Sequence, residues 1–109
     1  MLEVIFGNST MERVLLFVYV YGEGYGNKIS KTFKIPILSI QKQLRRLEEG
    51  GVLVSQKKGK TRIFTFNPRY VFLDELKKML EKAMKMLSDK EVQKYYRMRT
   101  RPRKTGKPL

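Results

Sequence analysis

The feature that most constrains the fold is a change of hydrophobic period at Gly50 and Gly51. Before these glycines, apolar residues recur at the spacing of one helix face, and they are Ile40, Leu44 and Leu47. Pro36 prevents a helix from entering this segment from upstream, because proline lacks an amide hydrogen and clashes with the preceding turn. Glycine commonly ends a helix. The sequence therefore predicts a helix over about Ile37 to Glu49.

Two β-prone runs follow the glycines. They cover residues 52–57 and 61–66, and Lys58-Gly59-Lys60 joins them. A glycine at the tightest point of such a connection is typical of a β-hairpin. The tip gathers cations, namely Lys57, Lys58, Lys60 and Arg62. We therefore expect a basic hairpin whose tip contacts phosphates.

The side of the 37–49 helix that lies opposite its apolar stripe follows from a rotation of about 100° per residue. Arginine can bond guanine with two hydrogen bonds, glutamine can bond adenine, and an aliphatic side chain can contact a thymine methyl group. This side and its edges hold residues of these kinds. We predict that DNA bases are read by Leu38, Ser39, Gln41, Lys42 and Arg45, and that Arg46 contacts the DNA backbone.

Upstream, an apolar run extends from Val14 to Tyr21. Ser9 and Glu12 have the spacing of a capping box, which predicts a helix from Thr10 to about Tyr21. Because the run is rich in β-branched and aromatic residues, a buried strand is the alternative. A run that is apolar on every side should be buried from more than one direction.

A short helix is expected after a glycine-rich turn. The glycines at 22, 24 and 26 match no phosphate-binding loop, since no Gly-Lys-Ser/Thr follows them. Asn27 is a candidate N-cap for a helix that reaches Phe33, with Ile29 and Phe33 facing inward. The outer side of this helix and its end hold Lys28, Lys31 and Lys34, for which we predict phosphate contacts.

The last helical pattern follows Asn67-Pro68. Its apolar residues alternate spacings of three and four, as in a coiled-coil seam, and they are Leu73, Leu76, Leu80, Ala83 and Leu87. Such a seam either covers the protein's own core or pairs with a second copy, and we favour pairing. Ser88 and Glu91 form a second capping-box pattern, so the helix should kink or restart there.

Charge is divided unevenly along the chain, in which 24 Lys and Arg and 10 Asp and Glu leave a net charge of +14. Residues 1–27 carry −2, residues 28–69 carry +9, residues 70–91 are neutral and residues 92–109 carry +7. A surplus of this size repels itself unless a polyanion neutralises it. A basic arm is expected from Arg97, Arg99, Arg101, Arg103, Lys104 and Lys107, with a disordered tail as the alternative.

The chain has no cysteine and no histidine. Disulfides, thiolate nucleophiles and the usual zinc and copper ligands are therefore excluded, and we expect no metal and no other cofactor. The adjacent carboxylates Glu48-Glu49 and Asp74-Glu75 do not converge as a catalytic pair would, so we expect no enzyme activity.

No apolar run approaches the ~20 residues that span a membrane. We see no secretory signal either, and expect a cytoplasmic protein without a membrane partner.

The order of elements over residues 10–66 resembles the winged helix-turn-helix. The segment from Ile40 to Val54 is similar to the recognition helix and wing of ArsR-like and MarR-like transcriptional regulators. The resemblance implies a mostly α fold with a small β-hairpin wing (α+β) and a long C-terminal helix. It also implies a homodimer whose terminal helices pair, so that its recognition helices enter successive major grooves.

Two departures limit what the resemblance implies. Sensing of thiophilic metals does not carry over without cysteine or histidine, and Pro36 stands where the family usually has a small polar cap. We expect a DNA-binding domain over residues 1–68, a dimerisation helix over 69–96 and a basic arm over 97–109. The predicted function is a transcriptional regulator that binds double-stranded DNA sequence-specifically. The alternatives are an RNA-binding or ribosome-associated winged helix and an interaction module for a separately encoded enzyme.

Overall fold

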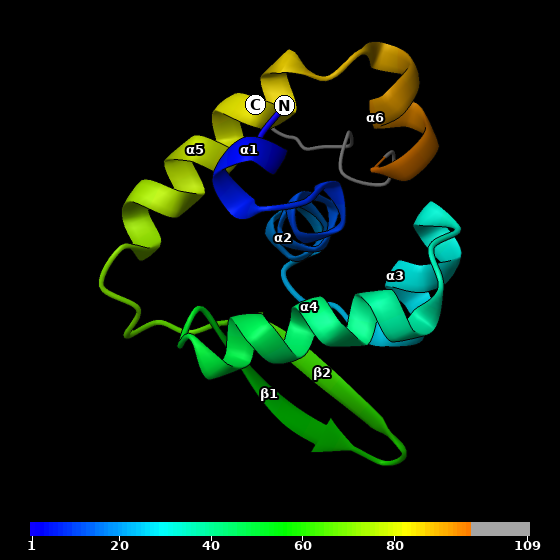
Figure 1. The fold of residues 1–109 in the computed structure, drawn as a ribbon, viewed down its shortest axis with the longest axis vertical. Helices are drawn as coiled ribbons and strands as arrows, with labels where there is room; N and C mark the ends of the chain where they lie inside the picture. The colour runs from blue at the N-terminus through cyan, green and yellow to red at the C-terminus, as the bar shows by residue number, and fades with distance from the viewer. Residues whose placement is uncertain (97–109) are drawn as a thin grey trace.

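The computed structural model describes residues 1–96, which form a mostly helical fold with one β-hairpin (Figure 1). The predicted fold class, an α+β winged helix-turn-helix, is confirmed. The elements in chain order are α1 (Glu3–Phe6), α2 (Ser9–Tyr21), α3 (Gly26–Phe33), α4 (Ile37–Glu49), β1 (Leu53–Lys58), β2 (Thr61–Phe66), α5 (Leu73–Met86) and α6 (Asp89–Tyr95). None of the helices over these residues is long and apolar enough to cross a membrane.

Helix α2 forms the centre of the core. Every side chain from Val14 to Val18 is buried, and Figure 1 shows α2 nearly end-on among α1, α4 and α5. The prediction of a helix here is confirmed, and the alternative of a strand is wrong. Enclosure on all sides explains why the run is apolar all round, because each face of the helix meets a neighbouring element.

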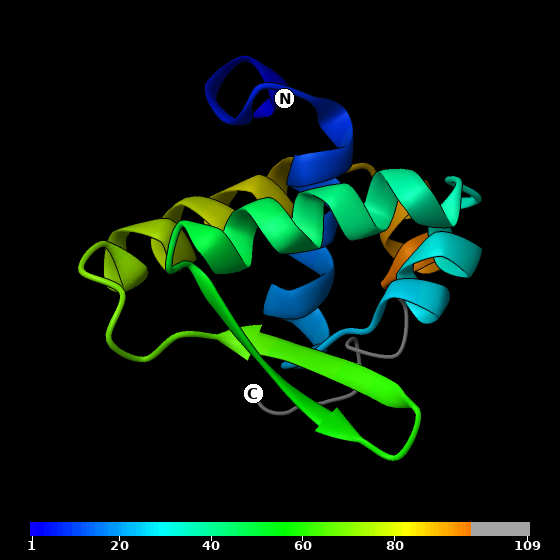
Figure 2. The same ribbon diagram turned by 60° about the horizontal axis from the view of Figure 1, so that its bottom comes forward.

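The hairpin projects from the body of the molecule beneath α4 (Figure 2). Strands β1 and β2 pair antiparallel from Leu53 opposite Phe66 to Lys58 opposite Thr61, which leaves a two-residue loop. Gly59, the first loop residue, has a φ of +64°, the left-handed conformation that glycine adopts at no steric cost. The predicted hairpin is confirmed, with its first strand one residue later than expected.

A single backbone bridge ties the hairpin to the beginning of α3. The amide and carbonyl groups of Gly24 exchange hydrogen bonds with those of Phe64, at 2.9 and 2.8 Å. A Cβ atom at Gly24 would lie 3.0 Å from the Ile29 side chain and 3.1 Å from that of Phe17, so a larger residue would require these core side chains to shift by a few tenths of an ångström. The predicted cap Asn27 is wrong. The bridge keeps the chain extended to Tyr25, and α3 begins at Gly26 without a side-chain cap.

The C-terminal helical segment is divided into α5 and α6 at the predicted restart. Residue Leu87 is extended, and the Ser88 hydroxyl accepts a hydrogen bond from the Glu91 amide at 3.1 Å, so the chain restarts as α6 at the predicted cap. Because the cap offers the first amides of α6 a side-chain acceptor, a new helix begins there in a different direction.

The seam on α5 packs inside this one chain. Leu76, Leu80 and Ala83 are 8%, 0% and 3% exposed and belong to the same core as α2, while Leu73 and Leu87 are half-buried. The prediction that this seam pairs with a second copy is therefore wrong, because side chains that cover their own core are not available to a partner helix. Residues 69–96 share the core of the preceding residues.

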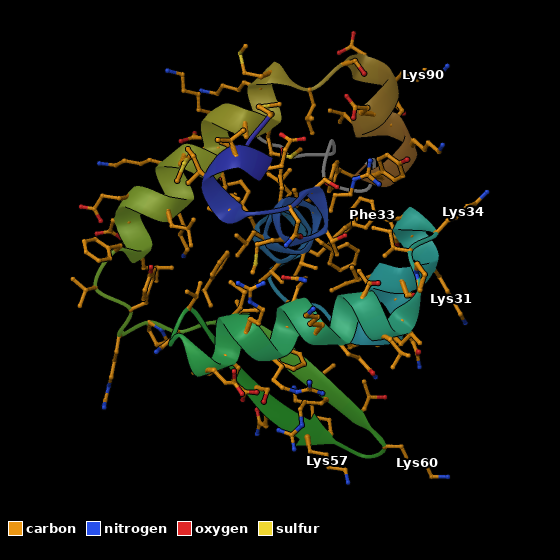
Figure 3. The ribbon with its side chains drawn as sticks, viewed as in Figure 1. Lys31, Phe33, Lys34, Lys57, Lys60 and Lys90 are labelled. Atoms are coloured by element: carbon orange, nitrogen blue, oxygen red, sulfur yellow. The ribbon has the colours of Figure 1, made fainter. Side chains whose placement is uncertain are left out.

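Aromatic contacts dock α6 onto α2 and the end of α3. The Tyr21 hydroxyl donates to the Tyr95 carbonyl at 2.7 Å, and the Phe33 ring lies 4.9 Å from the Tyr95 ring and 5.9 Å from the Tyr96 ring (Figure 3). The Arg13 guanidinium lies 5.5 Å from the Phe33 ring centre and 5.7 Å from that of Tyr95. Cation–π contacts of this kind stabilise by about 0.5–2 kcal/mol.

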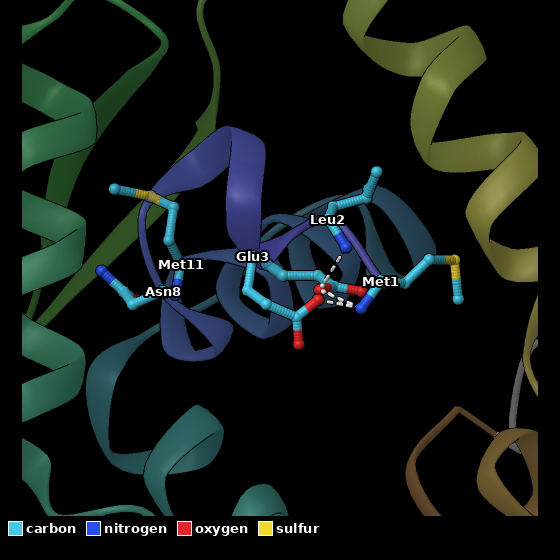
Figure 4. Close-up of polar contacts among 6 residues, drawn as sticks. Met1, Leu2, Glu3, Asn8 and Met11 are labelled. Atoms are coloured by element: carbon cyan, nitrogen blue, oxygen red, sulfur yellow. Dashed lines mark hydrogen bonds and ion pairs between the residues drawn. The ribbon is translucent and has the colours of Figure 1, made fainter.

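The cap of α2 differs from the predicted one. The Asn8 side chain accepts from the Met11 amide at 2.7 Å, so Ser9 is the first helical residue (Figure 4). Asparagine caps a helix as well as serine does, which moves the boundary one residue upstream. Glu12 is 7% exposed and accepts instead from the Leu2 amide at 2.9 Å, which holds the N-terminal segment against α2.

Candidate nucleic-acid interface

Helix α4 presents one polar face to solvent. All six side chains predicted to contact DNA from this helix are exposed, while Ile40, Leu44 and Leu47 are buried against the core. The predicted division of the helix into two faces is therefore present. Sequence reasoning missed Gln43, which is 6% exposed, because its amide placed it among polar residues although its position lies beside the buried stripe.

Leu38 is 75% exposed at the start of α4. A fully exposed leucine forgoes about 1.5–3 kcal/mol of burial, and nothing else on the outer face of this helix is apolar. Its neighbours on the same face are the polar side chains of Gln41, Lys42 and Arg45. The face thus combines hydrogen-bond donors and acceptors, positive charge and one aliphatic group.

The wing carries four exposed cations close together. Lys57 and Arg62 occupy directly opposed positions of the two strands, Lys58 ends β1 and Lys60 lies in the loop. Like charges on opposed strand positions destabilise a hairpin. Their presence here indicates a surface suited to an anionic partner that would relieve the repulsion.

A groove of about 520 Å³ runs between α4 and the wing. Its polar lining comes from four elements or their junctions and includes Asn27, Gln41, Arg45, Glu48, Lys60 and Arg62. The structure thus brings two predicted base readers, Gln41 and Arg45, beside two predicted backbone contacts of the wing. Tyr25 also lines the groove. The place of Tyr25 in the groove could not be predicted from the sequence, because it depends on the bridge between Gly24 and β2.

The lysines of α3 lie at a different edge of the interface. Lys28, Lys31 and Lys34 are exposed, and Figure 3 shows Lys31 and Lys34 pointing outward at the turn before α4, well away from Lys57 and Lys60 on the wing. Cations therefore border α4 at its start and along the wing. The predicted arm residues from Arg97 to Lys107 lie outside the described residues.

None of these cations is neutralised by a carboxylate of the described chain. Among residues 1–96 the ion pairs join the N-terminal amine to Glu3 and Glu12, and Lys85 to Glu81 at 4.0 Å. The +9 of residues 28–69 is therefore displayed to solvent over α3, α4 and the wing.

No group of three or more Asp and Glu side chains over residues 1–96 is arranged to hold a metal ion. Comparisons with models of protein families, with curated proteins and with solved structures find no match for this chain. A functional proposal therefore rests on the exposed polar face of α4 and on the exposed cations around it.

Proposed function

We propose that the protein is a cytoplasmic, sequence-specific regulator of transcription that binds double-stranded DNA. In this proposal α4 enters the major groove, and the wing residues 57–62 contact the sugar-phosphate backbone. The observation that carries it is the outer face of α4, where Leu38, Gln41 and Arg45 stand exposed and opposite a fully buried stripe. A helix of this kind fits the major groove and can distinguish base pairs there.

Eight cations surround these base readers and are proposed to bind phosphate: Lys28, Lys31, Lys34, Arg46, Lys57, Lys58, Lys60 and Arg62. If about six of them neutralise phosphates, the logarithm of the binding constant should fall with the logarithm of salt concentration with a slope near −5, because each contact releases about 0.9 counterion. A slope near zero for binding to duplex would contradict DNA binding.

Selection of bound duplexes from a random pool tests sequence reading directly. An enriched sequence should lose about 1–3 kcal/mol of discrimination at one position when Arg45 is replaced by alanine, since a bidentate arginine–guanine pair is lost. Lys60→Ala is the matched control. It should weaken binding to all sequences alike, because phosphate contacts carry no sequence information. Equal behaviour of the two variants would overturn the assignment of base readers.

The resemblance to ArsR-like and MarR-like regulators extends the proposal to a homodimer on a roughly twofold site. Because the α5 seam is buried, pairing would use the exposed apolar side chains of the less basic segments: Val4, Ile5, Val71, Phe72 and Met86. The proposed basic arm, residues 97–109, would add phosphate contacts beyond the two half-sites.

RNA is the competing partner for a surface this basic. Competition between a duplex DNA and structured or single-stranded RNA separates the two, since A-form RNA hides its major groove from an inserted helix. Preferential displacement by RNA would replace the DNA proposal. Co-purification of an enzyme in the absence of nucleic acid would instead favour an interaction module.

A further inference from the structure

One carboxylate stands among the cations of the groove between α4 and the wing. Of the described residues that line this groove, Glu48 alone is acidic, and it lies with Arg45, Lys60 and Arg62. The same groove is where the proposed function places nucleic acid. A carboxylate in this groove would repel phosphate, so its presence there calls for a physical explanation.

Glu48 is joined to the wing through a serine. The Ser55 hydroxyl on β1 donates to the Glu48 carboxylate at 2.6 Å, and Arg62 Nη1 on β2 donates to the same hydroxyl at 2.9 Å. A hydroxyl has one donor and two acceptor lone pairs, so Ser55 can serve both partners at once. The guanidinium of Arg62 is thereby already directed toward an anion of its own chain.

The neighbouring carboxylate, that of Glu49, has different surroundings from that of Glu48. Glu49 is equally exposed and follows Glu48 on α4, but it does not line the groove. Within residues 1–96, its carboxylate makes no hydrogen bond or ion pair. The two glutamates therefore carry the same charge on the same helix with different surroundings, which makes Glu49 a matched control.

We propose that Glu48 is a positioning residue, which competes through Ser55 with nucleic-acid phosphate for the guanidinium of Arg62. The inference rests on the proposed function. A phosphate that binds Arg62 through Nη1 must displace its bond to Ser55, and it meets a guanidinium already directed toward the Glu48 carboxylate. Because phosphate contacts carry no sequence information, this competition lowers affinity for specific and non-specific duplexes alike, while the base contacts of Gln41 and Arg45 discriminate between them.

The test compares Glu48→Gln, which keeps the shape of the side chain and removes its charge, with Glu49→Gln. Binding to a short duplex of mixed sequence is measured between 50 and 200 mM salt. Freeing Arg62 for one more phosphate should steepen the salt slope by about 0.9, so that the Glu48→Gln protein loses about 3.5-fold more affinity over this range than wild type. Glu49→Gln should leave the slope unchanged, and Ser55→Ala should shift it in the same direction as Glu48→Gln.

The Arg62→Gln background separates competition from a general effect of charge. There, Glu48→Gln should change the slope no more than Glu49→Gln does. The inference is overturned if the two glutamate variants behave alike, if the Glu48→Gln change persists without Arg62, or if Glu48→Gln weakens binding to every duplex.

A measurement on the free protein distinguishes failure of this inference from failure of DNA binding. Rotation of the Arg62 guanidinium, followed through its ¹⁵N resonances, should be slower in wild type than in the Ser55→Ala and Glu48→Gln proteins. A wild-type protein that binds duplex with a slope near −5 but shows no such difference refutes only the role of Glu48. A wild-type protein that binds no duplex refutes both.

Discussion

Lys34 combines an unfavourable backbone conformation with an exposed positive charge, and mutations can test the two effects separately. It follows α3 with a φ of +57°, and it is the one non-glycine residue of the described chain with a positive φ. The left-handed conformation costs an ordinary residue roughly 1–2 kcal/mol. Glycine would remove that cost.

Lys34→Gly should therefore stabilise the protein by about 0.5–1 kcal/mol, once the greater flexibility of the unfolded glycine chain is included. The same change should reduce the magnitude of the salt slope for duplex binding by about 0.9, because one phosphate contact is lost. Urea unfolding and binding titrations measure the two effects.

Lys31→Gly is the control for this change. It also removes one cation, but from inside α3, where glycine costs about 1 kcal/mol. A loss of stability in both variants would show that Lys34 is not strained in solution.

Tyr96 links stability to alkaline pH. Burial raises the pKa of its hydroxyl above the ordinary value of 10.0, and the nearby Arg13 opposes the rise without cancelling it. Because the folded protein binds this proton more tightly than the unfolded chain does, the associated stability is fully present below about pH 10 and is lost as the pH rises above it.

Tyr96→Phe should therefore flatten the loss of stability above pH 10, as measured by urea unfolding at a series of pH values. Tyr19 offers a comparison, since burial also raises its pKa but the side chain is only half-buried. An unchanged pH dependence in the Tyr96→Phe protein would show that another group controls alkaline unfolding.

At the scale of elements, mutations on α5 can test whether this helix covers the core of its own chain. Leu80 is fully buried and Met86 is 68% exposed on the same helix. Leu80→Ala should destabilise the protein by about 2–5 kcal/mol through lost burial and a cavity. Met86→Ala should change stability by less than about 0.5 kcal/mol. If the Leu80→Ala cost appears only at concentrations where copies associate, the seam belongs to an oligomer after all.

Several elements could be predicted from the sequence because their signals are local. Helix α4 has its predicted bounds, since Pro36 and Gly50 mark both ends, and the hairpin turn depends on Gly59 alone. The restart of the chain at Ser88 follows in the same way from a cap and a helix pattern. The outer face of α4 was predictable too, because helix geometry fixes which residues lie opposite a buried stripe.

What the sequence did not predict depends on contacts between distant segments. The bridge from Gly24 to Phe64 involves one residue pair and leaves no alternating pattern. The link from Glu48 through Ser55 to Arg62 needs three elements to meet. The seam on α5 has the same spacing whether it packs against α2 or against another chain, so its role followed only from the fold.

For the whole molecule, association is proposed to use apolar side chains that the fold leaves exposed. Val4 and Ile5 on α1 are 92% and 67% exposed, so lysine at both positions should leave the fold intact. Sedimentation should then show a dimer for wild type and a monomer for the Val4→Lys, Ile5→Lys protein. Leu38→Lys, at an exposed apolar side chain of α4 outside the proposed dimer surface, should remain dimeric. A monomeric wild type at micromolar concentration would contradict the homodimer.

The burial of the α5 seam has a consequence for how the protein responds to dilution. Because one chain closes its own core, the monomer should stay folded after the proposed dimer dissociates, and at such dilutions its melting temperature should no longer depend on protein concentration. A single copy is then a folded unit with its α4 face already in place. Under the proposed function, one copy would bind half of a twofold site alone, and a second copy would then bind beside it.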